Sequence, residues 1–261
     1  MSMLINNKIH SIDNKRIVII IPTYNEIDNV ETILKQILSL KLETDIIFID
    51  DNSPDGTGDK LDQLSKDFIN VSVLHRKCKI GVGSAIREGI QYAYDNGYQI
   101  LITMDSDFSH SPEFIPEFLQ RAKSSDIVVG SRFIKKKSLK EWNLYRKLLT
   151  HIGHVATTHL LQMPYDSTGG FRLYRLDQIS RDFLDKVSSN SYAFTFETLF
   201  VLHYNNYLIN EFPLHLPARV YGSSKMSTND VFHSLWCLLK IFILSNINKG
   251  FYSLALTDKS N

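Results

Sequence analysis

Short apolar runs alternate with segments of helical periodicity along the first half of the chain. Residues 17–21 and 46–49 are uninterrupted apolar runs, whereas residues 30–38 place apolar side chains at intervals of three and four. Further strands are predicted at 71–74, 100–104 and 127–129, and further helices at 61–68, 81–96 and 112–123. Parallel strands need long crossover connections, which such helices supply. The alternation therefore predicts an α/β fold with a mostly parallel sheet flanked by helices.

The composition restricts the class of protein. The chain has 261 residues, of which 43% are hydrophobic and 22% charged, as in ordinary globular proteins. Its net charge of +1 provides no overall field that would attract nucleic acid, so no nucleic-acid partner is expected. The two cysteines show neither metal-ligand spacing nor a disulfide framework. Residues 1–15 form a polar tail that lacks the apolar core of a signal peptide.

Polar side chains follow three of the predicted strands. Pro22-Thr-Tyr-Asn-Glu26 follows the first strand, Asp50-Asp-Asn-Ser-Pro-Asp-Gly56 the second and Asp105-Ser-Asp107 the fourth. Open α/β sheets bind ligands at the carboxyl ends of their strands. Paired carboxylates there suit Mg²⁺ or Mn²⁺ held together with a diphosphate, and Tyr24 suits packing near a base. Each motif alone is equally compatible with a turn or a helix start, because Asp, Asn and Ser are common turn residues.

Taken together, these three motifs resemble those of family 2 glycosyltransferases with the GT-A fold. Four later segments, at 130–132, 142–147, 166–172 and 219–225, follow the order seen in dolichol-phosphate mannose synthases and related polyprenyl-phosphate glycosyltransferases. The resemblance implies one GT-A domain over residues 16–227, with a mixed, mostly parallel Rossmann-like sheet. It also implies transfer of a sugar, with mannose from GDP-mannose favoured, onto the phosphate of dolichol or another polyprenol.

The resemblance implies roles for individual residues. The residues that would contact the nucleotide sugar are Pro22, Tyr24, Glu26, Ile49, Asp51, Asp105, Ser106, Asp107, Arg132, Arg219 and Lys225. The metal ion, Mg²⁺ or Mn²⁺, would be held by Asp105 and Asp107, with Ser109 at the position of a further ligand. The catalytic residues would be Asp107 together with four cations that neutralise the phosphates, namely Arg132, Arg146, Arg219 and Lys225.

Three positions depart from the pattern of the family. Ser106 stands where alanine is usual, and Ser109 stands where glutamine is often found. A hydroxyl is a poorer direct metal ligand than the amide oxygen of glutamine, so the set of protein ligands is expected to be less complete than the family pattern implies. Thr168-Gly-Gly-Phe171 has an additional glycine in place of a serine, which gives that loop more backbone freedom.

The C-terminal segment, residues 228–261, raises the question of a membrane. Residues 231–244 are apolar apart from His233, Ser234 and Lys240, and these fourteen residues are fewer than the roughly 20 that span a bilayer. Trp236 and Phe242 beside Lys240 suit a helix that lies in the membrane interface. The alternative is a helix packed on the domain or on another subunit. The chain is therefore expected to act peripherally on the cytoplasmic face of a membrane, where a small membrane-embedded subunit is a candidate partner.

Other functions remain open from the sequence. A UDP-sugar donor, with glucose as the sugar, is the second choice after GDP-mannose. A nucleotide-sugar sensor would keep the nucleoside motifs without the cations that serve an acceptor phosphate, whereas this chain has both. A GT-A enzyme for a soluble sugar would need a catalytic carboxylate near an acceptor hydroxyl. Gly81-Val-Gly83 is a weak match to a dinucleotide-binding loop, because the third glycine is missing.

Overall fold

Seven strands form one mixed sheet in the computed structural model, which describes residues 15–135, 144–214 and 228–255. The strands are β1 (Ile17–Thr23), β2 (Thr44–Asp50), β3 (Val71–His75), β4 (Ile100–Thr103), β5 (Ile127–Ser131), β6 (Arg172–Arg175) and β7 (Ile209–Pro213). Their order across the sheet is β3-β2-β1-β4-β6-β5-β7. All neighbours are parallel except β6, which runs antiparallel to β4 and β5. The predicted α/β class and all five predicted strands are confirmed.

The order of the strands reverses between β1 and β4. From β1 the chain first adds β2 and β3 on one side, and it then returns to place β4 on the other side of β1. Such a switch point leaves a crevice outside the carboxyl ends of the two strands, because their connections leave in opposite directions. Residues that directly follow β1, β2 and β4 therefore meet at one edge.

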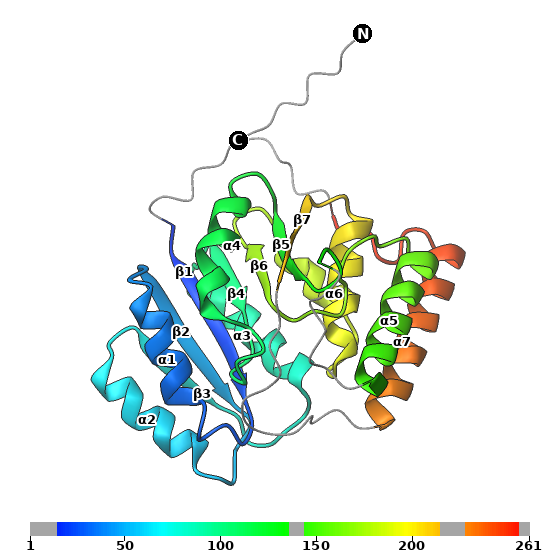
Figure 1. The fold of residues 1–261 in the computed structure, drawn as a ribbon. Helices are drawn as coiled ribbons and strands as arrows, with labels where there is room; N and C mark the ends of the chain where they lie inside the picture. Colours follow the sequence, from blue (N-terminus) through cyan, green and yellow to red (C-terminus); the bar gives the residue numbers. More distant parts are fainter. Residues whose placement is uncertain (1–14, 136–143, 215–227, 256–261) are drawn as a thin grey trace.

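Helices cover both faces of the sheet (Figure 1). On one face lie α1 (Val30–Ser39), α2 (Thr57–Asp67) and α4 (Ile115–Ala122), and on the other α3 (Val82–Asp95) and α6 (Ala193–Tyr204). Two short 3₁₀ helices, η1 (Pro112–Phe114) and η2 (Arg181–Lys186), lie in the connections. At the end of the molecule beyond α6 lie α5 (Leu144–Leu160) and α7 (Thr228–Ile247), opposite α1 and α2.

The continuous apolar runs of the central strands follow from burial on both faces. In β1, Val18 and Ile20 face the core beside α3 and α6, whereas Ile19 and Ile21 face the core beside α1 and α4. All four side chains are fully buried. A strand with both faces covered needs apolar side chains at every position instead of at alternate positions.

Strand β6 was not predicted, and its sequence, Arg-Leu-Tyr-Arg, explains why. Arg172 and Arg175 are at most 1% exposed, although arginine is a residue that is normally found at the surface. The Arg172 guanidinium donates to the carbonyl oxygens of Thr195 and Ser167, both at 2.6 Å. The Arg175 guanidinium pairs with Asp177 at 2.8 Å. These partners offset the cost of burying the two charges.

Helix α7 is longer than the apolar run in the sequence. It has twenty residues, because polar residues at both ends continue the helix, and the predicted length of fourteen residues was too short. The helix is long and apolar enough to cross a membrane, and 17% of its eighteen-residue apolar stretch is buried inside the protein. Cys237, Leu238 and Ile241 join the core beside α6, so one side of the helix packs on the domain.

Candidate functional site

The three predicted site segments turn sharply at the ends of their strands. Asn25, Asn52 and Phe108, which follow β1, β2 and β4 respectively, have positive φ angles of 56°, 56° and 61°. Asparagine adopts this left-handed conformation more readily than most residues, but for a bulky side chain such as that of Phe108 it is strained. Strained backbone of this kind is concentrated at functional sites. The turns direct the polar side chains toward the edge of the sheet.

The turn after β4 orients the Asp107 carboxylate. Its Oδ1 atom accepts hydrogen bonds from the Ser109 amide at 3.0 Å and from the Ser109 hydroxyl at 2.6 Å. The left-handed conformation of Phe108 makes this return possible, because it brings residue 109 back over residue 107. Ser109, which was predicted as a metal ligand, thus lies where it orients Asp107, another of the predicted metal ligands. Ser106 is buried between the two aspartates.

His110 ties Asp105 to the loop that precedes β6. Its Nδ1 atom accepts a hydrogen bond from the Asp105 amide at 2.8 Å and lies 3.7 Å from the Asp105 carboxylate. The same ring stacks on Phe171, with the ring centres 5.0 Å apart. The Thr103 hydroxyl, at the end of β4, donates to the Gly170 carbonyl at 2.7 Å. The segment at 166–171 is therefore fixed beside the two aspartates.

The segments after β1 and β2 bind each other. The amides of Asn25, Glu26 and Ile27 donate to the side chains of Ser53, Thr57 and Asp55, respectively, at 3.0, 2.9 and 3.3 Å. The Asp55 carboxylate also accepts from the Thr57 amide and hydroxyl at the start of α2. These bonds keep the pKa of Asp55 below its ordinary value in spite of partial burial.

Among the predicted nucleotide-binding residues, Asp51 and Tyr24 each contact a cation. The buried Asp51 carboxylate pairs with the Arg76 guanidinium, which also donates to Glu88 at 2.9 Å. Burial raises the pKa of Asp51 even though Arg76 opposes the shift. The Lys79 ammonium lies 4.0 Å from the centre of the Tyr24 ring. Pro22 and Ile49, which were predicted to line the same pocket, are half-buried and fully buried within their strands.

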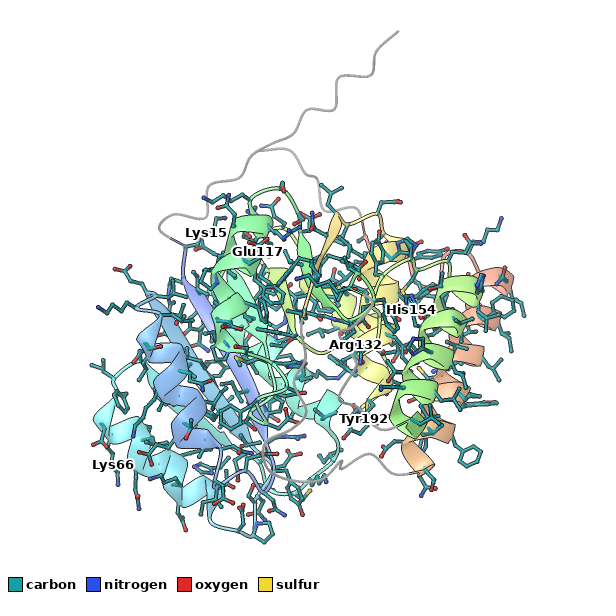
Figure 2. The ribbon with its side chains drawn as sticks, viewed as in Figure 1. Lys15, Lys66, Glu117, Arg132, His154 and Tyr192 are labelled. Atoms are coloured by element: carbon teal, nitrogen blue, oxygen red, sulfur yellow. The ribbon has the colours of Figure 1, made fainter. Side chains whose placement is uncertain are left out.

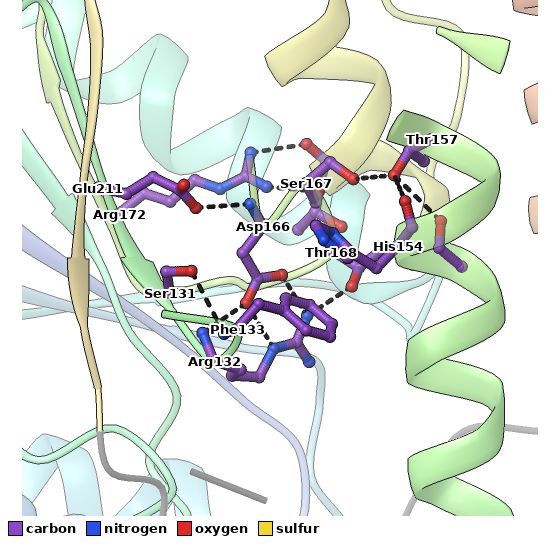
Figure 3. A network of polar contacts seen from close by, with 12 residues as sticks. Ser131, Arg132, Phe133, His154, Thr157, Asp166, Ser167, Thr168, Arg172 and Glu211 are labelled. Atoms are coloured by element: carbon purple, nitrogen blue, oxygen red, sulfur yellow. Dashed lines mark hydrogen bonds and ion pairs between the residues drawn. The ribbon is translucent and has the colours of Figure 1, made fainter. Parts of the chain in front are cut away.

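Arg132 follows β5, and the structure pairs it with a carboxylate that the sequence did not single out. Its guanidinium binds Asp166 in a two-pronged contact, with Nε to Oδ2 at 2.7 Å and Nη2 to Oδ1 at 2.6 Å (Figure 3). The Arg132 amide donates to the same carboxylate at 2.9 Å. Asp166 is fully buried, yet its pKa is lowered, because the Arg132 charge and hydrogen bonds outweigh the effect of burial.

Two further charged residues surround this pair. Glu211 on β7 accepts a hydrogen bond from the Asp166 amide at 2.6 Å, and burial raises the pKa of Glu211. The buried Arg172 lies close enough to favour the ionised form of both carboxyl groups. The network thus joins the end of β5 and the middle of β7 to the start of β6. Asp166 and Arg172 begin and end the motif at 166–172, but no individual role was predicted for either, and Glu211 belongs to none of the motifs.

The glycines at the start of α3 serve close packing. Gly81 has a φ angle of 133°, which strongly favours glycine, and a Cβ atom there would overlap the Asn190 carbonyl. A Cβ atom at Gly83 would overlap the Phe194 side chain. The guanidinium of Arg87 on α3 donates to the carbonyls of Leu184 and Val187, both at 2.8 Å. These contacts hold the segment before α6 against the start of α3.

The structure does not describe the side chains of three of the four cations that were predicted to bind the phosphates. Arg219 and Lys225 lie outside the described residues, and of Arg146 the structure describes only the backbone, in the first turn of α5. Arg132 is therefore the one predicted acceptor cation whose contacts are described. It lies at the same edge of the sheet as Asp105 and Asp107, because β4 and β5 both run antiparallel to β6.

The donor atoms at the end of β4 fit Mg²⁺ or Mn²⁺. Asp105 and Asp107 provide hard carboxylate oxygens, and Ser109 fixes the orientation of Asp107 as an outer-shell partner. Within residues 15–135, 144–214 and 228–255, no three His, Cys, Asp or Glu side chains come together as a metal cluster. Magnesium is commonly bound by one or two carboxylates plus substrate phosphates, so two aspartates are sufficient.

The sequence is similar to those of known sugar transferases. Residues 18–183 match glycosyl transferase family 2. An undecaprenyl-phosphate mannosyltransferase from Micrococcus luteus is 36% identical over 213 residues, which cover 81% of this chain and 88% of that protein. A polyprenol monophosphomannose synthase from Mycolicibacterium smegmatis is 32% identical over 220 residues, covering 83% of each chain.

The fold is similar to those of solved transferases of more distant sequence. Glucosyl-3-phosphoglycerate synthase from Mycobacterium tuberculosis, solved with Mn²⁺, UDP-glucose and glycerol 3-phosphate, superimposes with a TM-score of 0.61 at 17% identity, covering 87% of this chain and 80% of that one. Mannosyl-3-phosphoglycerate synthase from Rubrobacter xylanophilus gives a TM-score of 0.62 at 13% identity, covering 95% and 78%. At such identities the likeness concerns the fold alone, and it confirms the predicted GT-A arrangement.

Proposed function

The chain belongs to glycosyl transferase family 2, and from that premise we propose that it transfers mannose from GDP-mannose to the phosphate of a membrane polyprenol. That it is a glycosyltransferase follows from the family and from its mannosyltransferase relatives. Donor, acceptor and metal dependence are the proposed part. Both named relatives act on polyprenyl phosphates and transfer mannose, which supports this pair of substrates over a UDP-glucose donor.

One observation carries the proposal more than any other. The aspartates at the end of β4 and the Arg132–Asp166 pair at the end of β5 lie at the same edge of the sheet. The segment at 166–171 contacts Arg132 on one side, and Thr103 and His110, which flank the two aspartates, on the other. Anionic oxygens for a metal–diphosphate thus lie beside a fixed cation. A reaction between a nucleotide diphosphate sugar and a phosphate acceptor needs both, because the two substrates repel each other.

In this proposal Asp105 and Asp107 hold Mg²⁺ or Mn²⁺ against the donor diphosphate. A bound divalent ion supplies Lewis-acid stabilisation of the negative charge on the departing nucleotide. The protein's own contribution is to fix Asp107 through Ser109 and to fix Asp105 through His110. Tyr24, Glu26 and Asp51 border the neighbouring strand ends, where we place the nucleoside.

The acceptor phosphate is already an anion, so it needs no strong general base. It does need positive charge, and Arg132 is held in place for this by Asp166. Because Asp166 offsets the Arg132 charge, we assign the remaining neutralisation to Arg146, Arg219 and Lys225. Arginine suits this role, because its planar fork binds phosphate oxygens in pairs.

The product should have an inverted anomeric centre. A direct attack by the acceptor phosphate oxygen on the sugar gives inversion, and we assign no side chain of the described residues as a nucleophile that would form a covalent sugar intermediate. An α-linked donor should therefore yield a β-linked polyprenyl phosphate mannose. The test is the anomeric C–H coupling constant of the purified lipid product by NMR. An α-linked product would contradict the single-displacement reaction while leaving the choice of substrates intact.

A membrane acceptor also requires contact with the bilayer, which we assign to α7. Trp236, 70% exposed, and Lys240 line a pocket of ≈ 520 Å³ together with Ile80, the neighbour of Gly81. The Lys240 ammonium donates to the Ser188 hydroxyl at 3.1 Å. The helix therefore borders the segment that packs on the start of α3, close to the proposed donor site.

Charged substitutions on the exposed side of α7 should weaken membrane binding. In the double variant Trp236→Glu/Leu239→Glu, two carboxylates replace apolar side chains that are 70% and 44% exposed. Flotation with liposomes should fall, whereas GDP affinity measured by calorimetry should stay unchanged. Leu208→Glu, at a residue 62% exposed beside β7, is the matched control and should float like the unmodified protein. If a folded double variant floats normally, α7 packs on the protein without contacting lipid.

A further inference from the structure

Helix α5 carries an apolar stripe that faces away from the protein. Leu144, Leu148, Ile152 and Val155 are 82%, 56%, 51% and 53% exposed. Their spacing of four, four and three residues places them on one side of the helix. The stripe was not predicted from the sequence.

Exposed apolar side chains are concentrated on two helices. Among the residues that the structure describes, eighteen large hydrophobic residues are exposed, and twelve of these lie on α5 and α7. Both helices lie at the same end of the molecule, beyond α6 (Figures 1 and 2). Isolated exposed apolar residues are ordinary, whereas a concentration of this kind marks an interaction surface.

The charge of α5 identifies the chemistry of its partner. Residues 144–160 include Arg146, Lys147 and three histidines, and they include no aspartate or glutamate. Basic residues beside an apolar stripe suit the surface of an anionic bilayer. A second copy of the same helix would bring like charges together, so a symmetric α5–α5 contact is disfavoured.

The inner side of α5 contacts the residues next to the Arg132–Asp166 pair. The Ser167 hydroxyl donates to the Thr157 hydroxyl at 2.7 Å (Figure 3). The His154 ring stacks on Phe133, the neighbour of Arg132, with ring centres 3.8 Å apart. Gly153 faces the Thr168 side chain, which accepts a hydrogen bond from the Arg132 guanidinium. A single helix thus has lipid-compatible residues outside and active-site contacts inside.

We propose that the outer stripe of α5 docks on an anionic lipid bilayer and, through its inner contacts, orients the Arg132 end of the active site toward the membrane. This inference rests on the proposed function, because it deepens the account of how a lipid acceptor is reached. The stripe lies on the membrane surface beside the exposed side of α7. The headgroup phosphate of the acceptor then approaches the site along the edge where β4 and β5 end.

The test replaces two stripe residues by acids, in the variant Leu148→Glu/Ile152→Glu. Binding is measured by flotation with vesicles of phosphatidylcholine, with and without phosphatidylglycerol. The unmodified protein should float better with phosphatidylglycerol, and the variant should partition at least about tenfold less, since two apolar contacts are lost. Ile69→Glu, at a fully exposed isoleucine between α2 and β3, is the matched control and should float normally. Leu144→Glu, at the most exposed stripe position, replaces the double variant if that fails to fold.

A second readout separates this proposal from the proposed function. The variant should lose transfer to polyprenyl phosphate in vesicles but keep transfer to a short, water-soluble isoprenyl phosphate. If the folded variant floats like the unmodified protein, or if it instead abolishes dimers without changing flotation, the membrane role of α5 is wrong. If the unmodified protein transfers mannose to neither acceptor, the proposed function fails, while flotation still decides the role of α5.

Discussion

Asp107→Ala should abolish transfer without unfolding the protein. We assign this carboxylate to the metal–diphosphate, and loss of one such electrostatic contact typically lowers the rate by about 10²–10³-fold or more. The fold should tolerate the change, because Asp107 lies in the loop after β4, outside the two apolar cores, where its contacts include hydrogen bonds from the amide and hydroxyl of Ser109. Asp107→Asn keeps an oxygen that can accept both bonds, so its thermal unfolding should match that of the unmodified protein while its turnover is lost.

Three measurements together check this expectation. Turnover is compared with Mn²⁺ binding in the presence of GDP, followed by calorimetry, and with thermal unfolding followed by circular dichroism. Asp67→Ala, at an exposed aspartate at the end of α2, is the matched control and should leave all three unchanged. Excess EDTA should stop the unmodified enzyme. Full activity of the Asp107 variants, or activity indifferent to EDTA, would show that the metal is not held here.

Asp166→Ala should produce the largest loss of stability of any variant considered. It removes the partner of Arg132 inside the protein, and breaking a buried ion pair in this way costs about 3–5 kcal/mol. Asp95→Ala is the matched control, because it removes the partner of Arg181 from an ion pair in which both side chains are about half exposed. An exposed pair contributes only about 0–1 kcal/mol. Urea unfolding at neutral pH measures both differences, and equal losses would mean that the Arg132–Asp166 pair is not structural.

The stabilising effect of Asp166 should depend on pH in one direction. Its folded-state pKa is lowered, since the Arg132 charge outweighs burial, so folding favours the ionised carboxylate. The contribution is complete above the unfolded-state pKa of about 4 and disappears as the pH falls through the lower folded-state pKa. The stability difference between the unmodified protein and Asp166→Ala should therefore be constant from neutral pH down to about pH 5 and shrink in stronger acid. A difference that grows in acid would contradict the assigned ionisation.

The first half of the fold could be predicted because its strands are buried on both faces. The apolar runs in β1 and β2 predict buried parallel strands, since continuous β-branched residues between helical segments favour a parallel sheet. Strand β6 could not be found in this way, because it begins and ends with buried arginines. Some of the carbonyl groups that accept their hydrogen bonds, those of Thr195 and Ala122, come from distant parts of the chain. The length of α7 was underestimated, because the polar residues at its ends interrupt the hydropathy pattern but not the helix.

The candidate site was predictable where one local motif supplies the chemistry. Asp105 and Asp107 follow directly from a buried strand, and the structure places them at the expected edge. The partner of Arg132 could not be predicted, because Asp166 is 34 residues away and meets it only through the antiparallel return of β6. The supporting roles of Ser109 and His110 depend on the left-handed turn at Phe108, which a sequence pattern does not reveal.

The central claim is that this chain mannosylates a lipid phosphate, and a direct transfer assay tests it most simply. The full-length protein is incubated with Mg²⁺ or Mn²⁺, polyprenyl phosphate and, in separate reactions, radiolabelled GDP-mannose, UDP-glucose and other nucleotide sugars. The lipid is then extracted into organic solvent and counted. We predict label in the organic phase with GDP-mannose, and none when polyprenyl phosphate is omitted or when Asp107→Ala replaces the unmodified protein. Two outcomes would contradict the account: label that enters the organic phase only when the donor is a UDP-sugar, and an organic phase that stays unlabelled with every donor.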